Sequence, residues 1–236
     1  MCSSDLYGAA KYGHLEVLKW LHQTFGLTRE DATSKHNRAF SLAAKKGQLE
    51  VCEWLYNTFS ITKEYILIED YHIFASMAHK GRLDILKWMH TAFKLTKKDA
   101  TSQNNAAFRW AAEKGHLEIL KWLYSTYDLT PDDNISCDGY IFDLAFENGH
   151  LEVLKWVYDT FGTKKIYLDM NDYSTFASLA SEGRLDILKW IYSVFTCELN
   201  NFTIDYINRT FRWAAANGHL EILKWLYTTF NVMKSN

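Results

Sequence analysis

The chain has 236 residues, of which 48% are hydrophobic and 16% aromatic, and this composition excludes an intrinsically disordered protein. Its formal net charge is −2, with acidic and basic residues interspersed, so it lacks the basic face with which nucleic-acid-binding proteins neutralise phosphates. It contains no run of 18 apolar residues, and we therefore expect neither a nucleic-acid partner nor a membrane span.

The chain begins with MCSSDL, a segment that fits nothing after it. It resembles a translated sequencing-adapter fragment of the kind found at the edge of environmental contigs. We therefore expect residues 1–6 to be a non-native leader and the natural protein to extend further upstream. Residues 7–236 are expected to form a single repeat array.

A glycine followed by nearly the same nine-residue string recurs through the whole chain. The strings begin with GHLEVLKWL and end with GHLEILKWL, and five of the six intervals between glycines are 34 residues, the last being 35. The glycines are Gly13, Gly47, Gly81, Gly115, Gly149, Gly183 and Gly218. A fixed period of this length indicates stacked repeats that share one core, with about seven units of which the first is truncated.

Each repeat is predicted to contain two helices that reverse at the glycine. Before Gly115, the residues Phe108, Ala111 and Ala112 have the i, i+3, i+4 spacing of one helix face, and the small alanines allow close packing between repeats. The glycine ends this helix and permits a tight reversal. Four polar residues that precede the recurring phenylalanine by four positions are expected to cap the first helix: Asp70, Asn104, Asp138 and Asp172.

A tryptophan recurs in the second helix of every repeat. These residues are Trp20, Trp54, Trp88, Trp122, Trp156, Trp190 and Trp225. Leu117, Leu120 and Leu123 form the apolar stripe of one such helix, and Trp122 widens it. Because the repeats stack, we expect the tryptophans to form a column along the outer helices. Burial of so large a ring predicts that Trp122→Ala reduces the free energy of unfolding by roughly 3–5 kcal/mol.

A third element is predicted after the second helix. Thr28, Thr62, Thr96 and Thr130 precede short polar segments, and the chain's only proline, Pro131, follows Thr130 at the first-turn position that tolerates proline best. These threonines are expected to cap a short extra helix.

The segment FSLAAKKG (Phe40 to Gly47) followed by QLEVCEWL, like the GHLEVLKWL strings, resembles ankyrin repeats, and the resemblance covers essentially the whole chain after residue 6. It is similar to the long, tryptophan-rich ankyrin arrays of giant DNA viruses and protists. The TPLH stretch and the usual β-hairpin finger sequence are absent, and the threonine-capped helix occupies the finger's place. A 34-residue period also suits tetratricopeptide repeats, but the glycine-centred reversal favours ankyrin. The predicted fold is an all-α, ankyrin-like helical repeat solenoid with a short helix in place of the β-hairpin finger.

The resemblance implies that a partner binds on the concave face, at the end of the inner helix and at the finger tips. The inner-helix candidates are the variable residues before each glycine: Lys45, Lys46, His79, Lys80, Glu113, Lys114, Glu147, Asn148, Ser181 and Glu182, with Ala216 and Asn217 in the last repeat. The finger candidates are Tyr71, Tyr140 and Tyr173, because exposed tyrosines suit interfaces. The alternatives are that the polar residues are merely solvated and that the tyrosines pack under the neighbouring repeat.

Other conspicuous residues are expected to be structural. Trp110 and Trp213, two positions after the recurring phenylalanine, are predicted to lie in the core, and Cys52 is predicted to be a buried small hydrophobic residue. Four histidines follow a repeat glycine: His14, His116, His150 and His219. Because their spacing distributes them along the array, we expect them to start helices rather than to bind a metal. No catalytic motif stands out, so neither an enzyme nor a cofactor is expected.

The sequence therefore predicts a protein–protein interaction module, monomeric, with an unidentified protein partner that would be a host protein if the chain is viral. The isolated cysteines favour a reducing compartment, namely the cytoplasm, or the host cytoplasm for a viral protein. One alternative is a structural spacer or virion component. Another is the targeting arm of a larger, truncated protein, such as a ubiquitin-ligase adaptor, although no F-box-like segment follows residue 225.

Overall fold

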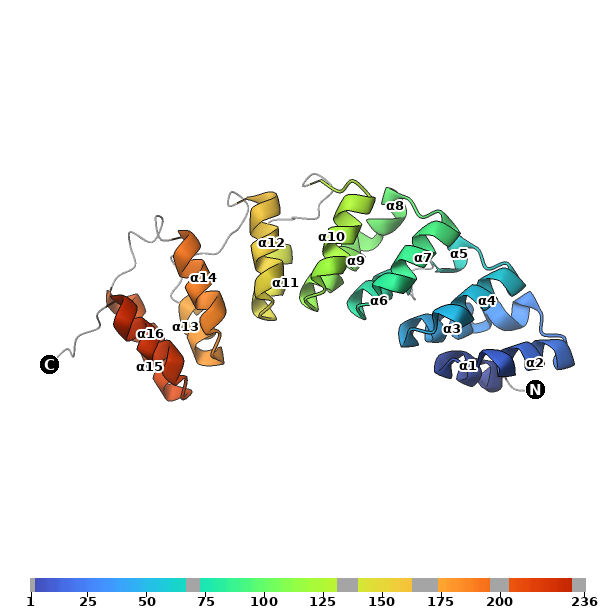
Figure 1. Cartoon of the computed structure of the whole chain (residues 1–236), viewed down its shortest axis with the longest axis horizontal. Helices are drawn as coiled ribbons and strands as arrows, with labels where there is room; N and C mark the ends of the chain where they lie inside the picture. Colours follow the sequence, from blue (N-terminus) through green and yellow to red (C-terminus); the bar gives the residue numbers. More distant parts are fainter. Residues whose placement is uncertain (1–2, 67–72, 131–139, 163–173, 196–203, 231–236) are drawn as a thin grey trace. The chain divides into compact units, whose positions relative to one another are not determined.

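The computed structural model describes residues 3–66, 73–130, 140–162, 174–195 and 204–230, and all regular structure in these residues is α-helical (Figure 1). The helices group into two compact units, Met1–Gly162 and Thr163–Asn236. Helix pairs that repeat along the sequence build both units. This confirms the predicted all-α helical repeat solenoid.

The first unit contains five helix pairs, taken over its described residues. Its helices are α1 (Ser3–Tyr12), α2 (Leu15–Phe25), α3 (Arg29–Lys46), α4 (Leu49–Phe59), α5 (Lys63–Ile66), α6 (Ile73–His79), α7 (Leu83–Phe93), α8 (Lys97–Ala100), α9 (Ser102–Glu113), α10 (Leu117–Thr126), α11 (Tyr140–Glu147) and α12 (Leu151–Phe161). The first helices of the pairs, α1, α3, α6, α9 and α11, pack on one another in succession and are called the inner row. The second helices, α2, α4, α7, α10 and α12, are called the outer row, and each packs on the inner helix of its own pair (Figure 1).

The second unit contains two further pairs in its described residues. They consist of α13 (Ser174–Glu182) with α14 (Leu185–Phe195), and α15 (Ile204–Ala216) with α16 (Leu220–Phe230). Helix α13 packs against α15, so these two helices are the inner row of this unit, and α14 and α16 are its outer row.

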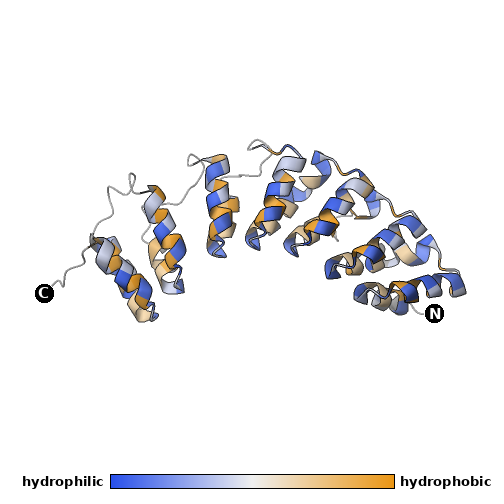
Figure 2. Cartoon of the chain, viewed as in Figure 1, coloured by the Kyte–Doolittle hydropathy of each residue, from blue (hydrophilic) through white to orange (hydrophobic). Residues whose placement is uncertain are grey.

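The core between the inner helices consists of the recurring phenylalanine and the alanines that follow it. Phe108, Ala111 and Ala112 are fully buried, as are Phe40, Ala43 and Ala44 of α3. Each helix carries both apolar and polar residues (Figure 2), so one face is available for this core while the other meets solvent. In α1 the phenylalanine position is taken by Leu6, which is only 1% exposed. The assignment of residues 1–6 as a leader stays a prediction.

The reversal between the two helices of a repeat requires glycine for two separate reasons. Gly115 has a positive φ of 73°, and the amide of His116 donates to the carbonyl of Ala111 at 2.8 Å, which closes the end of the inner helix. A Cβ atom on Gly115 would also lie 2.5 Å from Nδ1 of His150 in the next repeat. The glycine therefore serves the turn and the packing between repeats together.

The threonine-capped element is confirmed in part. The hydroxyl of Thr96 and the carboxylate of Asp99 form a capping box that starts the four-residue helix α8, and Lys63 of the preceding repeat pairs with Asp99 at 3.2 Å. After Thr28, however, the capped helix is not a separate element but the beginning of α3, which runs on for 18 residues. The segment after Thr130 lies outside the described residues.

Of the four caps predicted for the inner helices, only Asn104 lies in the described residues. Asn104 has a left-handed backbone, with φ 55° and ψ 48°, rather than the extended conformation of an N-cap residue, so that prediction was wrong. The backbone turns left-handed at three successive residues there, from Gln103 to Asn105, where α8 leads into the inner helix. The other predicted caps, Asp70, Asp138 and Asp172, lie outside the described residues.

The outer-row tryptophans are half-buried, apart from Trp20, which is 56% exposed, and their contacts differ from the predicted column. Trp122 lies edge-on to Tyr127 of its own repeat, with ring centroids 5.8 Å apart, and to His90 of the preceding repeat at 6.1 Å. His90 and Tyr127 are themselves joined by a hydrogen bond of 3.0 Å. The equivalent contacts recur along the first unit, as in the pair formed by Tyr56 and Trp88. An aromatic ladder of alternating residue types therefore joins the outer helices.

Candidate functional site

The predicted inner-helix contacts lie at the C-terminal ends of the inner-row helices, next to the glycine turns. In the first unit the exposed members are Lys46, Lys80, Lys114, Glu147 and Asn148, and the half-buried members are Lys45, His79 and Glu113. In the second unit Ser181 is half-buried, while Glu182, Ala216 and Asn217 are exposed. Within each unit these residues occupy the same end of successive helices, and they are accessible to a partner.

The three predicted finger tyrosines can be judged at one position. Tyr71 and Tyr173 lie outside the described residues. Tyr140 begins α11 and is 46% exposed, and the guanidinium of Arg109 lies 5.4 Å from its ring centroid. This cation–π contact holds an exposed ring on the inner row, so Tyr140 does not pack under the neighbouring repeat.

His14, His116 and His150 stand at the N-cap positions of the outer helices, as predicted, but their side chains do not cap these helices. His116 precedes the outer helix α10, but its side chain makes no capping bond to that helix. Its Nε2 instead donates to the carbonyl oxygen of His79, at 3.1 Å, in the preceding repeat. His150 donates in the same way to the carbonyl of Glu113 at 2.9 Å. Since a carbonyl can only accept, Nε2 carries the proton in each case.

These histidine ties fix the backbone of the candidate site. The accepting carbonyls belong to His79 and Glu113, which are themselves predicted contact residues, and in the second unit His219 donates to the carbonyl of Ser181 at 2.9 Å. Each tie satisfies a carbonyl at the end of an inner helix, where no intrahelical donor remains. The following repeat thereby holds the backbone from which the variable side chains project.

Lysines at the ends of the inner helices act on the polar groups beside them. Lys114 pairs with its neighbour Glu113 at 2.8 Å. The pKa of His79 is lowered from its ordinary value, first by burial and then by the positive charges of Lys114 and Lys80. Two lysines from adjacent repeats therefore act on the same imidazole.

The inner row carries two tryptophans that were predicted to lie in the core. Trp213 is 46% exposed on α15, so the prediction was wrong for this residue. Trp110 is half-buried and lies edge-on to His79, with ring centroids 5.9 Å apart. Both occupy the position two residues after the phenylalanine, which the helical period turns away from the core that the phenylalanine enters.

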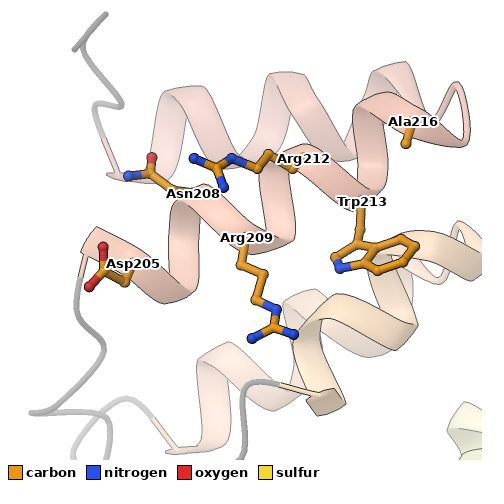
Figure 3. Close-up of a pocket in the computed structure, with 6 residues that line it drawn as sticks. All are labelled: Asp205, Asn208, Arg209, Arg212, Trp213 and Ala216. Atoms are coloured by element: carbon orange, nitrogen blue, oxygen red, sulfur yellow. The ribbon is translucent and has the colours of Figure 1, made fainter.

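In the second unit, Trp213 borders an open groove between α13 and α15. The groove has a volume of about 270 Å³ and is lined by Ala177, Ser178, Ser181, Glu182, Arg209 and Trp213. Figure 3 shows Arg209 and Trp213 projecting from the same side of α15, with Asp205, Asn208 and Arg212 also on this helix. An indole beside guanidinium, hydroxyl and carboxylate groups combines apolar area with several hydrogen-bonding partners.

The buried cysteine of the first unit has a structural role. Cys52 is fully buried on the outer helix α4 as predicted, and burial raises the pKa of its thiol far above the ordinary value. Across the described ranges, no three or more His, Cys, Asp or Glu residues gather closely enough to hold a metal ion. The part of the chain that the structure describes also contains no helix of the length and hydropathy that a membrane span needs.

Parts of the sequence match a known protein family. The family model described as ankyrin repeats (many copies) matches residues 6–57 and 108–157. These stretches correspond to the helices α1 to α4 and α9 to α12. No curated protein matches the chain.

Proposed function

Because this chain carries ankyrin repeats, which generally mediate protein–protein interaction, we propose that it binds a partner protein along its inner row, the concave face of an ankyrin-type solenoid. Ankyrin-repeat proteins are typically non-enzymatic interaction modules. The observation that carries the proposal is the contrast at the ends of the inner helices. There, variable and accessible side chains project from a backbone that the next repeat holds through a histidine tie.

Such an arrangement favours binding on entropic grounds. A partner that binds a loose segment must order it, and this ordering reduces the affinity. The carbonyls of His79, Glu113 and Ser181 are already bonded to the following repeat, so the side chains of these residues start from a fixed backbone. The binding face is therefore pre-organised.

The groove at Trp213 supplies the features of an energetic hot spot. Tryptophan and arginine are the residue types most enriched among side chains that dominate interface energies. Trp213 and Arg209 line the same groove, together with hydroxyl and carboxylate groups that can orient a partner. We place one anchor of the partner there.

The location, oligomeric state and class of partner are proposed from the sequence. We propose a cytoplasmic monomer that binds a host protein, in the host cytoplasm, if the resemblance to viral arrays reflects its origin. A targeting arm of a larger protein, including a ubiquitin-ligase adaptor, would use the same inner row. A stiff structural spacer or virion component is the second candidate, and the aromatic ladder of the outer row favours it because it joins successive repeats without needing a partner.

Photo-crosslinking can test the inner-row proposal. A photoreactive amino acid at Ser178, on the groove, is compared with one at Lys121, on the exposed side of the outer helix α10. The binding proposal predicts that in cell extract a discrete adduct forms at Ser178, does not form at Lys121, and is lost with Trp213→Ala. The matched control is Trp20→Ala, since Trp20 is an equally large and similarly exposed ring on the outer row.

The possible outcomes separate the two candidate functions. An adduct that depends on Trp213 and not on Trp20 supports binding along the inner row. Equal labelling at both positions, or an adduct unaffected by Trp213→Ala, would contradict it and leave the spacer as the better description.

A further inference from the structure

Three lysines hold the same place in three successive repeats of the first unit. Lys46, Lys80 and Lys114 each directly precede the glycine turn and are exposed, and Lys45 stands beside the first of them. These four residues are called the lysine row. Lys45, Lys46 and Lys80 form no ion pair with any residue in the described ranges, and Lys114 pairs only with the adjacent Glu113 among them. The row is thus a set of positive charges that the described part of the chain leaves largely uncompensated.

The lysines act together although they belong to different repeats. His79 lies between two of them, and the charges of Lys114 and Lys80 both contribute to lowering its pKa, after burial. The ring of Trp110, four residues before Lys114 on α9, lies edge-on to His79. Positive charges near an aromatic ring favour a ligand that combines carboxylates with apolar side chains.

The lysine row ends at α11, where the side chains before the glycine are no longer positively charged. The next repeat has Glu147 and Asn148 in place of the two residues before the glycine, and Asp143 lies one turn earlier on α11. Burial and the charge of Glu147 raise the pKa of Asp143. A negatively charged ligand is therefore favoured over α3, α6 and α9 and disfavoured at α11.

We propose that the lysine row binds an extended acidic segment of the partner protein, with one carboxylate facing each repeat. This inference rests on the proposed function and names the class of partner segment. Neighbouring packed helices lie about 8–10 Å apart. A peptide in the polyproline II conformation advances about 3.1 Å per residue and completes one turn in three residues, so every third side chain faces the same way and three residues span roughly one repeat. The segment thus carries an acidic side chain at every third position, over three such positions.

A peptide fits this surface better than a nucleic acid does. The phosphates of a nucleic acid are regularly spaced and cannot avoid Glu113 within the row or Glu147 at its end. A peptide can place neutral residues opposite these carboxylates. The net charge of −2 for the chain agrees with a local rather than a general attraction for anions.

The spacing can be tested with labelled peptides and the full chain. A ten-residue peptide with Glu at every third position is compared with peptides of identical composition that have Glu at adjacent positions or at every second position, and Kd is measured by fluorescence anisotropy. We expect the every-third peptide to bind at least fivefold more tightly than either other peptide. Equal affinity for all three, or tighter binding of a single-stranded oligonucleotide of the same charge, would overturn the proposal.

A matched set of variants locates the binding on the molecule. The triple variant Lys46→Gln, Lys80→Gln, Lys114→Gln is compared with Lys87→Gln, Lys121→Gln, Lys155→Gln, which removes the same charge from the outer row of three successive repeats. We expect the first to weaken peptide binding more than tenfold and the second less than twofold, with circular dichroism showing both folded. Equal losses would refute the lysine row as the site.

The two proposals can fail separately. If no peptide binds but the Trp213-dependent adduct at Ser178 still forms, the acidic segment is refuted while inner-row binding stands. If neither is observed, inner-row binding itself is contradicted.

Discussion

The outer and inner rows use the same side chain for opposite purposes. Trp122, on the outer row, is held edge-on between rings of its own and the preceding repeat. Trp213, on the inner row, borders an open groove and is 46% exposed. Residues that recur in every repeat, such as Trp122, therefore build the framework. Residues that differ between repeats, such as Trp213, occupy the surface available to a partner. Variants of the first class are expected to change stability and those of the second class to change binding.

The largest expected loss of stability comes from the glycine turn. Gly115→Ala must keep a left-handed backbone and place a Cβ atom against His150, so we expect the free energy of unfolding to fall by about 3 kcal/mol. Gly26→Ala is the control, because Gly26 also has a positive φ, of 62°, but nothing lies within 4 Å of its added Cβ. We expect about 1 kcal/mol there. Equal losses in urea denaturation would show that the tie to His150 contributes nothing.

The next effect tests the aromatic ladder. Trp122→Ala is expected to reduce the free energy of unfolding by about 2 kcal/mol, less than the sequence alone predicted, because the ring is half-buried rather than enclosed. Trp20→Ala serves as the comparison, since this ring is 56% exposed and should change stability by less than about 0.5 kcal/mol. Thermal and urea unfolding measure both. Similar values for the two variants would mean that the ladder does not stabilise the stack.

A smaller loss is expected when one histidine tie is removed. His150→Ala leaves the carbonyl of Glu113 without its donor and should reduce the free energy of unfolding by about 1 kcal/mol. Amide hydrogen exchange at the end of α9 should accelerate, because the tie holds that turn. Unchanged exchange in this turn, whatever the global stability, would argue that the histidine does not fix the binding face.

The smallest effect concerns the charge at the inner row. Besides burial, the groups that act on His79 are Lys114, Lys80, Glu113 and His116. Lys114→Gln removes one of the two lysines, so the pKa of His79 should rise toward its ordinary value, which NMR titration of the imidazole can follow. The sign follows from charge: a lysine disfavours the protonated imidazole, and its removal favours it. Lys121→Gln, on the outer row, should leave this pKa unchanged, and an equal shift in both variants would exclude a local cause.

Much of the fold could be predicted because its determinants are local. The 34-residue period, the helix faces around Phe108 and Leu120, and the turn at Gly115 all depend on residues close together in the chain. The capping box at Thr96 and Asp99 spans only four residues, and it was predicted in kind. The burial of Cys52 was also predictable, since it replaces a leucine of the helical stripe.

The site was harder to predict because its determinants lie one repeat away. The residues before each glycine could be located, and the histidines do start the outer helices as predicted. Nothing in the sequence shows, however, that the side chain of His150 also reaches the carbonyl of Glu113. Trp213 was assigned to the core, whereas the equivalent position holds leucine or serine in most other repeats, and this departure was the signal that could have identified it.

The sequence by itself determined the repeat, its two helices and its glycine turn, because helical period and backbone conformation are set by neighbouring residues. Only the tertiary structure decided which polar residues hold the repeats together and which face a partner. His116 and Lys80 are both polar residues beside a turn, yet one bonds the preceding repeat and the other remains exposed. That distinction depends on where the next repeat stacks, and stacking places side chains together that are 34 or more residues apart in the chain.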